Sequence, residues 1–370
     1  MTQPIAILRA GAVTSVGLNA PSTFAALRTR LNNFTETAFM DDRGEPIVAG
    51  LVPLPALSES IAEGYAPQTN PLHRHIELLS LAIFDCVRQL PPMNTLNIPL
   101  LVCVSELSRP ARPTKLDDGL FRGLQRRLGC QFSKESVVYA YGQASVGMAL
   151  NDAFTLLQRH PLVLLVGVDS LAHFDAIQAL HAKGRLFGAD NTDGYIPGEA
   201  ACALLLGGPE QIKKYPPMVS NVDEQPDTPS SHTPQTLYCM GLSVTREMAL
   251  QGGSEPNKGK GLNDAIRAAL KPIQGNATQV GLRICSQITT HYSAKEMAIG
   301  SARAEVDATA LWCLADSLGE TGAAAGPLSL AWAYSAMHKG YAPSTVALSL
   351  LTSEEGERSA TLLCFGHYTP

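Results

Sequence analysis

The chain has 370 residues, of which 45% are hydrophobic and 16% are charged, and its formal net charge is -5. The low charged fraction argues against disorder over most of the length, and the acidic balance without a Lys/Arg run argues against nucleic-acid binding. The chain has no run of about 18 apolar residues, and its first residues lack the pattern of a signal peptide. We therefore expect no membrane span and a cytoplasmic, globular protein.

The cysteine and histidine patterns do not indicate a metal site. Eight cysteines are scattered without a C-x-x-C pair, and several lie in apolar runs, which is typical of small buried side chains. His73 and His75 lie two residues apart at a predicted helix start, so they point to different faces. We interpret them as a solvated helix start, and we expect neither a metal nor a cofactor.

Short apolar runs alternate with segments of helical period in the first part of the chain. The predicted strands are 5–8, 100–105, 137–141, 162–168 and 200–206, and the predicted helices are 22–28, 72–87 and 144–159. Ser22 is the expected cap of the first helix, and residues 11–17 fit a turn after the first strand. Continuous apolar strands separated by helices favour a mostly parallel sheet covered on both faces.

The composition changes near residue 208. Residues 216–236 hold five prolines among polar residues, so no helix or strand is expected there. The alternation then resumes, with predicted helices at 262–270, 302–317 and 323–339 and predicted strands at 282–287, 345–351 and 360–364. We therefore predict two similar halves, 1–208 and 209–370, joined by an irregular Pro-rich connection.

Residues 137–206 carry the most specific motifs. One strand ends in Gly167-x-Asp169-Ser170, and a later loop fits the pattern R-x-F … D-G-(F/Y)-x-x-G-E-(G/A)-A. The loop residues are Arg185, Phe187, Asp193, Gly194, Tyr195, Gly198, Glu199 and Ala200. Residues 319–326 (GETGAAAG) are similar to a G-H-x-x-G-A-A-G helix start. With these motifs the whole chain resembles the β-ketoacyl synthases of the thiolase superfamily.

The resemblance implies an α/β thiolase fold with five layers, α-β-α-β-α, made of two duplicated halves. It also implies a dimer that pairs through the strand before Gln143. In this family Asp193 and Glu199 would be structural residues that hold their loop against the sheet.

A ketosynthase needs a cysteine at the start of a buried helix, which lowers the thiol pKa, and two histidines that stabilise an enolate. The cysteine position falls on Gln143, or on Ala144 if the alignment shifts by one residue. The histidine positions fall on Gln287 and Glu320, and Glu320 would serve a helix dipole. The resemblance therefore implies a protein without catalytic residues that cannot run the ketosynthase reaction.

Other positions do not restore the chemistry. The family lysine falls on Ala315, and residues 353–358 (SEEGER) replace the Gly-Phe-Gly-Gly gating loop. His291 lacks the context of the first histidine motif. Ser145 has no identifiable base beside it, and Gln143 as a decarboxylase residue would need the missing histidines.

Inactive proteins of this fold include two kinds. Chain-length factors pair with an active ketosynthase and also replace the cysteine by glutamine. Thiolase-like proteins associated with type VI secretion effectors share three features with this chain. These are Phe39-Met40-Asp41, Glu106 with Arg109-Pro110, and Glu320.

The resemblance to the second kind implies a non-catalytic adaptor or chaperone. Its partner would be a type VI secretion effector or a related component, and the protein would be a homo- or heterodimer. One alternative is a chain-length-factor-like partner of an active ketosynthase in polyketide or aryl polyene synthesis. Another is a residual acyl-carrier-protein decarboxylase or acyltransferase.

Overall fold

Ten strands form one continuous mixed sheet in the computed structural model, which describes residues 3–54, 70–88, 90, 98–216 and 234–368. The first five in order are β10 (Ala310–Cys313), β9 (Leu282–Cys285), β11 (Val346–Thr352), β12 (Glu357–Gly366) and β8 (Thr236–Arg246). The other five are β1 (Ile5–Thr14), β7 (Glu199–Gly207), β6 (Leu162–Ser170), β4 (Leu100–Cys103) and β5 (Val137–Tyr139).

The pairing pattern is the same from either end of this sheet. The three outer strands of each half are parallel, whereas the next pairings, β11–β12–β8 and β6–β7–β1, are antiparallel. The halves join where Ile5, Ala6 and Ile7 of β1 pair with β8. The fold is thus duplicated as predicted. A domain boundary at residue 208, between the end of β7 and the start of β8, stays a prediction.

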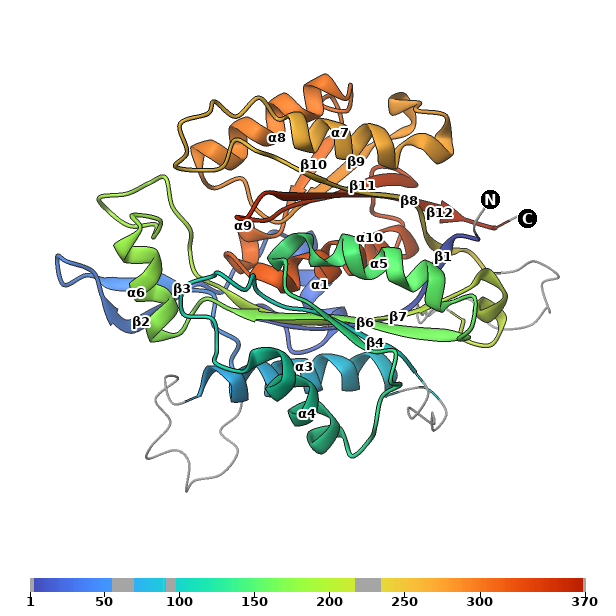
Figure 1. Cartoon of the computed structure of the whole chain (residues 1–370), viewed down its shortest axis with the longest axis horizontal. Helices are drawn as coiled ribbons and strands as arrows, with labels where there is room; N and C mark the ends of the chain where they lie inside the picture. Colours follow the sequence, from blue (N-terminus) through green and yellow to red (C-terminus); the bar gives the residue numbers. More distant parts are fainter. Residues whose placement is uncertain (1–2, 55–69, 89, 91–97, 217–233, 369–370) are drawn as a thin grey trace.

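The helices lie in three layers around the two half-sheets (Figure 1). The layer outside β8–β12 holds α7 (Lys260–Ala269) and α8 (His291–Arg303). The layer outside the other half holds α3 (Pro71–Val87) and α4 (Leu116–Leu128). Between the half-sheets lie α1 (Ala20–Arg28), α5 (Ser145–Leu156) and α10 (Ala325–His338). The predicted five-layered α-β-α-β-α arrangement is confirmed.

The central layer explains the composition of its helices. Every residue of α10 from Ala325 to Met337 is buried, and α10 is accordingly apolar or small on all sides. Outside the layers, β2 (Thr35–Met40) and β3 (Pro46–Ala49) form a separate hairpin. This hairpin lies beside α6 (Phe174–Ala182) at one end of the molecule (Figure 1).

Two sequence expectations are wrong. The described ten-stranded sheet has five antiparallel and four parallel strand pairs, so it is not mostly parallel. A continuous apolar run indicates a strand that is buried on both faces. In a sheet covered on both sides, antiparallel strands are buried in this way as well, so the run does not reveal strand direction. The predicted helix 302–317 instead spans the end of α8, strand β10 and the short α9 (Ala315–Leu318). A four-residue apolar run has too little period to separate strand from helix.

The start of the chain also differs in detail. Strand β1 continues through Gly11 to Thr14, and the expected turn begins there, with the N–H of Thr14 donating to the carbonyl of Gly17 at 2.8 Å. Asn19, and not Ser22, caps α1, because its side chain accepts the Ser22 N–H at 2.9 Å. Most of the predicted Pro-rich connection, residues 217–233, lies outside the described residues.

Among the helices of the described ranges, none combines the length and apolar content that crossing a bilayer requires.

Candidate functional site

The start of α5 is built on a glycine. Strand β5 leads into a 3-10 turn, Gly142–Ala144, which continues into α5. Gly142 has a φ of +56°, and a Cβ atom there would overlap the carboxylate of Glu106. Glycine is therefore required at this position, since it permits both the left-handed backbone and the close approach of Glu106.

The start of α10 has the same construction. A 3-10 turn, Gly322–Ala324, precedes the helix, and Gly322 has a φ of +50°. A Cβ atom on Gly322 would overlap the carboxylate of Asp169. The duplicated halves thus each present a helix start with a buried carboxylate packed against its first glycine.

A cavity of about 80 Å³ lies between these two helix starts. It is lined by three of the four predicted positions, Gln143, Gln287 and Glu320, whereas Ala144 is buried and does not line it. Glu106, Arg109, Arg185, Tyr195, Tyr292, Ser353 and Glu354 also contribute to its wall. None of the described residues that line the cavity is a cysteine or a histidine.

Gln143 and Glu320 are joined directly. Nε2 of Gln143 donates to Oε1 of Glu320 at 2.8 Å, and the same oxygen accepts the Gly322 N–H at 2.8 Å. Burial raises the pKa of the Glu320 carboxyl to about 7, and the Gly322 N–H and Gln143 oppose this effect only in part. Glu320 therefore accepts the first N–H of the turn that leads into α10, and it also bonds to the residue at the predicted cysteine position.

The backbone N–H at the start of α5 is occupied. Ser353 lies in the loop between β11 and β12, and its Oγ accepts the Ala144 N–H at 3.2 Å and donates to the carbonyl of Tyr141. The buried Arg358 fixes this loop, because it donates to the carbonyl of Ser353 at 2.8 Å and pairs with Glu296 at 2.8 Å. Residues 353–358 thus supply a side chain, that of Ser353, which binds the Ala144 N–H at the start of α5.

Gln287 serves a neighbouring helix. Its Oε1 accepts hydrogen bonds from the N–H of Thr289 at 3.1 Å and from the hydroxyl of Ser293 at 2.9 Å, beside the N-terminal cap of α8. His291 is exposed, and its N–H donates to Asp193. His291 therefore lies outside the cavity, and Asp193 ties its loop to the start of α8.

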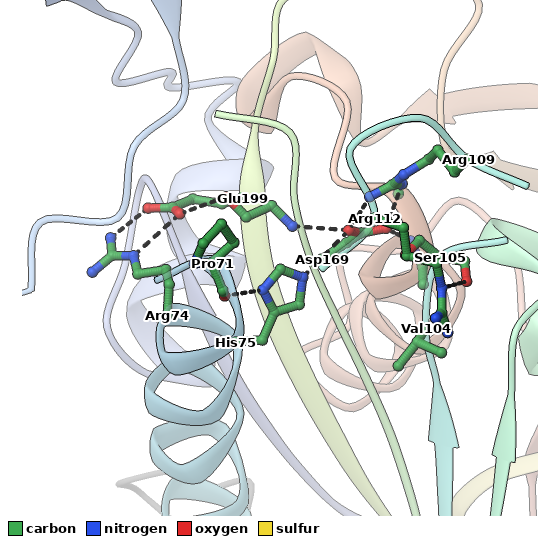
Figure 2. A network of polar contacts seen from close by, with 12 residues as sticks. Pro71, Arg74, His75, Val104, Ser105, Arg109, Arg112, Asp169 and Glu199 are labelled. Carbon is green, nitrogen blue, oxygen red and sulfur yellow. Dashed lines mark hydrogen bonds and ion pairs between the residues drawn. The ribbon is translucent and has the colours of Figure 1, made fainter. Parts of the chain in front are cut away.

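Arg109, in the wall of the cavity, forms an ion pair with the buried Asp169 (Figure 2). Arg109 binds both carboxylate oxygens of Asp169, with Nη1 at 2.7 Å from Oδ2, and Oδ2 also accepts the Ala323 N–H at 2.9 Å. Burial disfavours the charged carboxylate, but Arg109 and His75 outweigh this and lower the pKa of Asp169 below its usual range. The pair anchors the loop after β4 to the start of α10.

The interpretation of His75 as a solvated residue is wrong. Its side chain is fully buried, Nδ1 contacts the carbonyl of Pro71 at 2.6 Å, and Nε2 lies 3.6 Å from Asp169 (Figure 2). The spacing of His73 and His75 does place them on different faces, and only His73 is exposed. The face of α3 that meets β6 and β7 buries its polar side chains as well as its apolar ones.

Glu199 belongs to the same network. Its carboxylate binds Arg74 (Figure 2). It also accepts the Val52 N–H at 2.9 Å and the hydroxyl of Ser170 at 3.0 Å. These bonds tie α3 and the segment after β3 to the paired ends of β6 and β7. This geometry accounts for Glu199 as a structural residue.

Other candidate nucleophiles are engaged or remote. The hydroxyl of Ser145 donates to the carbonyl of Tyr139 at 2.9 Å and accepts the Tyr141 N–H. The eight cysteines are free, and burial raises the pKa of Cys86 to about 12 and also raises that of Cys103. Within the described residues, no group of three or more His, Cys, Asp or Glu side chains is arranged to hold a metal ion.

Sequence reasoning missed several residues of this site. The sequence assigns no role to Gly142 or Ser353 and does not predict the burial of His75. It also does not predict the close approach of Glu106 to Gly142 or the ion pair of Arg109 with Asp169. Gly142 had a usable signal, since a glycine between a strand and a buried helix is typical of a sharp turn. The contact of Ser353 joins positions 209 apart and has no local signal.

Comparison with known proteins gives structural matches only. No family profile matches this sequence, and no curated protein matches it. Similar solved structures include the AntDE:AntF complex, in which a type II polyketide synthase acyl-carrier protein is bound to its ketosynthase. The match has a TM-score of 0.75 at 13% identity and covers 98% of this chain and 99% of that one.

Two further matches contain a ketosynthase and a chain length factor. For the ishigamide ketosynthase/chain length factor, the TM-score is 0.68 at 16% identity, covering 98% of this chain and 99% of that chain. For ketosynthase ApeO with its chain length factor ApeC from Xenorhabdus doucetiae, it is 0.72 at 13% identity, covering 98% of each chain. Likeness at such low identity shows the fold alone, which is the thiolase fold of the β-ketoacyl synthases.

Proposed function

We propose that this protein is a non-catalytic relative of the β-ketoacyl synthases that acts by binding another protein. The observation that carries the proposal is the Gln143–Glu320 hydrogen bond, which joins the starts of α5 and α10. We take Gln143 as the cysteine position, because its side chain lines the cavity and Ala144 does not. On this assignment an amide, a second amide and a carboxyl replace the thiol and the two imidazoles.

The chemistry of the cavity supports this proposal. A ketosynthase needs a thiolate that forms a thioester and neutral imidazoles that stabilise an enolate. An amide side chain cannot form a thioester, and the Ala144 N–H, a candidate oxyanion donor, already binds Ser353. The volume of about 80 Å³ is also well below the ~300–1,000 Å³ of small-molecule sites, which leaves little room for an acyl chain.

We infer that the partner is a type VI secretion effector or a related component. Two of the three features that the chain shares with effector-associated proteins lie at the cavity, since Glu106, Arg109, Pro110 and Glu320 line it. The third, Phe39-Met40-Asp41, lies at the hairpin of β2 and β3. Phe39 and Met40 line a second hollow there, of about 480 Å³, between the hairpin and α6.

That second hollow is suited to protein contact. Met40 is 59% exposed and Phe174 is 42% exposed, so large apolar side chains meet solvent around it. Exposed apolar surface of this kind is typical of protein-binding sites.

A dimer through β5 is part of the proposal. Strand β5 is at the edge of the sheet with β4 as its neighbour, and Val137 at its start is 40% exposed. An edge strand presents unpaired backbone groups that a second chain can bind.

A chain-length-factor-like role is the second candidate. It is favoured by glutamine at position 143 and by the similarity to complexes described as a ketosynthase with its chain length factor. In that case the partner across β5 would be an active ketosynthase. A residual acyl-carrier-protein decarboxylase or acyltransferase is the third candidate. Decarboxylation in this family would need two imidazoles, and none of the described residues that line the cavity is a histidine.

The test is affinity purification of the tagged chain from its native host, followed by mass spectrometry of the bound proteins. Recovery of a secretion effector, or of another component of that machinery, supports the adaptor. Recovery of an intact ketosynthase with an acyl carrier protein contradicts it and supports the second candidate. Turnover of malonyl-acyl carrier protein by the purified chain would contradict both.

A further inference from the structure

Three backbone donors at the two helix starts are already occupied. The N–H of Gly322 donates to Glu320, that of Ala323 donates to Asp169, and that of Ala144 donates to Ser353. An enzyme that binds a developing oxyanion keeps such N–H groups free for the substrate. A ligand in this cavity would therefore be bound by side chains and not by these N–H groups.

Two acceptors in the cavity wall have no partner. Oε1 of Gln143 and Oε2 of Glu320 are buried and make no hydrogen bond within the described residues. Both side chains are more than nine-tenths buried, with Gln143 8% and Glu320 5% exposed, and both line the cavity. Buried acceptors without a partner are rare in folded proteins, and they indicate that a donor binds between them.

The charges around these acceptors favour a cation. Glu106, which is 5% exposed, adds a second carboxyl to the same wall. Three of the cations that line the cavity are paired with carboxylates, Arg109 with Asp169, Arg185 with Glu354 and Arg358 with Glu296. Lys183 is exposed to solvent, where its charge is screened.

We propose that this cavity binds a primary ammonium group, carried by a lysine side chain of the protein partner. The inference rests on the proposed function for the identity of the donor as a protein side chain. An ammonium group has three donors and no acceptor, which suits Gln143 Oε1, Glu320 Oε2 and the Glu106 carboxyl. A volume of about 80 Å³ admits an ammonium group with its last methylene groups and excludes a bulky ligand.

The first experiment tests the ammonium site without any partner. The purified chain is titrated with n-butylammonium chloride and, separately, with n-butanol at pH 8, and binding is followed by calorimetry and by the melting temperature. We expect n-butylammonium to bind at least about tenfold more tightly than n-butanol, and Glu320→Gln to abolish this difference. Glu305→Gln removes an exposed carboxylate on another surface and is the matched control, with wild-type binding expected.

The site is contradicted if n-butylammonium and n-butanol bind alike, or if Glu320→Gln binds n-butylammonium as the wild type does. The melting temperature of each variant without ligand, measured in the same titration, shows whether the variant is folded. Loss of binding is therefore distinguished from loss of the fold.

The second experiment tests the lysine. The wild type, Glu320→Gln and Glu305→Gln are used to purify the partner from the native host, and the recovered amount is compared. We expect Glu320→Gln to recover about tenfold less partner than the other two chains. Equal recovery by the three chains, together with n-butylammonium binding to the wild type, would overturn the proposal that a partner's lysine occupies the site. The site would then be assigned to a free amine. If no chain recovers a protein, the proposed function fails, and the titration alone decides the ammonium site.

Discussion

Nε2 of Gln143 donates a hydrogen bond to Oε1 of Glu320 at 2.8 Å, joining residues 177 positions apart. The bond connects the starts of α5 and α10, the central helices of the two duplicated halves. Both helices begin with a positive-φ glycine and a 3-10 turn. The pair thus occupies the point where the two halves meet, which is where the resemblance to β-ketoacyl synthases places a reactive thiol and an imidazole.

Replacing Gln143 by cysteine is expected to give an unreactive thiol. The thiolate would lie beside the Glu320 carboxyl, and a neighbouring negative charge raises a thiol pKa. At pH 8 the Glu320 carboxyl, with its pKa of about 7, is mostly ionised, and a rise of about one unit in the thiol pKa lowers the thiolate fraction about tenfold. We therefore expect iodoacetamide to modify Gln143→Cys about tenfold more slowly than the double variant Gln143→Cys/Glu320→Gln.

Mass spectrometry of the peptide that contains position 143 measures this rate. The half-buried Cys130 is present in both variants and is the internal reference. Equal rates in the two variants would show that Glu320 does not control the reactivity of this position.

Glu320 is expected to make stability depend on pH. Burial raises the pKa of its carboxyl from 4.5 to about 7; Glu354 adds to this rise, and the Gly322 N–H, Gln143 and Arg109 oppose it. The folded chain binds this proton more tightly than the unfolded chain does. The stabilisation is therefore complete below pH 4.5 and is lost as the pH rises through about 7.

Glu320→Gln removes this titration and retains an oxygen for the Gly322 N–H. Between pH 5 and pH 8, the free energy of unfolding of the variant is expected to rise by about 2–3 kcal/mol relative to the wild type. Urea unfolding at several pH values measures the difference, in which contributions of other groups such as Glu106 largely cancel. A difference that is constant with pH would mean that Glu320 keeps an ordinary pKa in the folded chain.

Removing Arg109 alone is expected to destabilise the protein more than removing both charges of the Arg109–Asp169 pair. Arg109→Met leaves the Asp169 carboxylate buried with only backbone donors and His75 nearby, which costs about 3–5 kcal/mol of unfolding free energy. The double variant Arg109→Met/Asp169→Asn removes the uncompensated charge and is expected to recover much of this loss.

The exposed pair of Arg43 and Asp190 is the control for this cycle. Its side chains are 57% and 62% exposed, so Arg43→Met is expected to change stability by less than about 1 kcal/mol. Chemical denaturation of the wild type and of four variants, Arg109→Met, Asp169→Asn, the double variant and Arg43→Met, completes the comparison. If the double variant loses as much unfolding free energy as the two single variants lose together, the two residues are not coupled and the prediction is contradicted.

The sequence carried enough information for the layers and the duplication. The apolar runs of 162–168 and 200–206 became β6 and β7, because strands covered on both faces need apolar residues at every position. The resemblance motifs supplied the five layers and the pairing of the halves. Strand direction was missed, since burial on both faces does not depend on it.

The candidate site was less predictable than the fold. Gln143, Gln287 and Glu320 were singled out from aligned motifs, and they line one cavity because the fold brings those motifs together. The closing contact of Ser353 with Ala144 and the burial of His75 against Asp169 depend on packing between distant segments. Local residue patterns contain no measure of such distances.

Gly142→Ala is expected to destabilise the protein more than a positive φ alone explains. An alanine at φ +56° pays a left-handed backbone cost of about 1–2 kcal/mol, and its Cβ would also overlap the carboxylate of Glu106. Gly44→Ala is a matched control, because Gly44 has a φ of +78° and a Cβ atom there meets nothing within 4 Å. The difference between the two variants isolates the overlap with Glu106, which we expect to add about 1–3 kcal/mol. Denaturant unfolding of both variants gives this difference, and equal losses would mean that the loop after β4 moves away from α5 without cost.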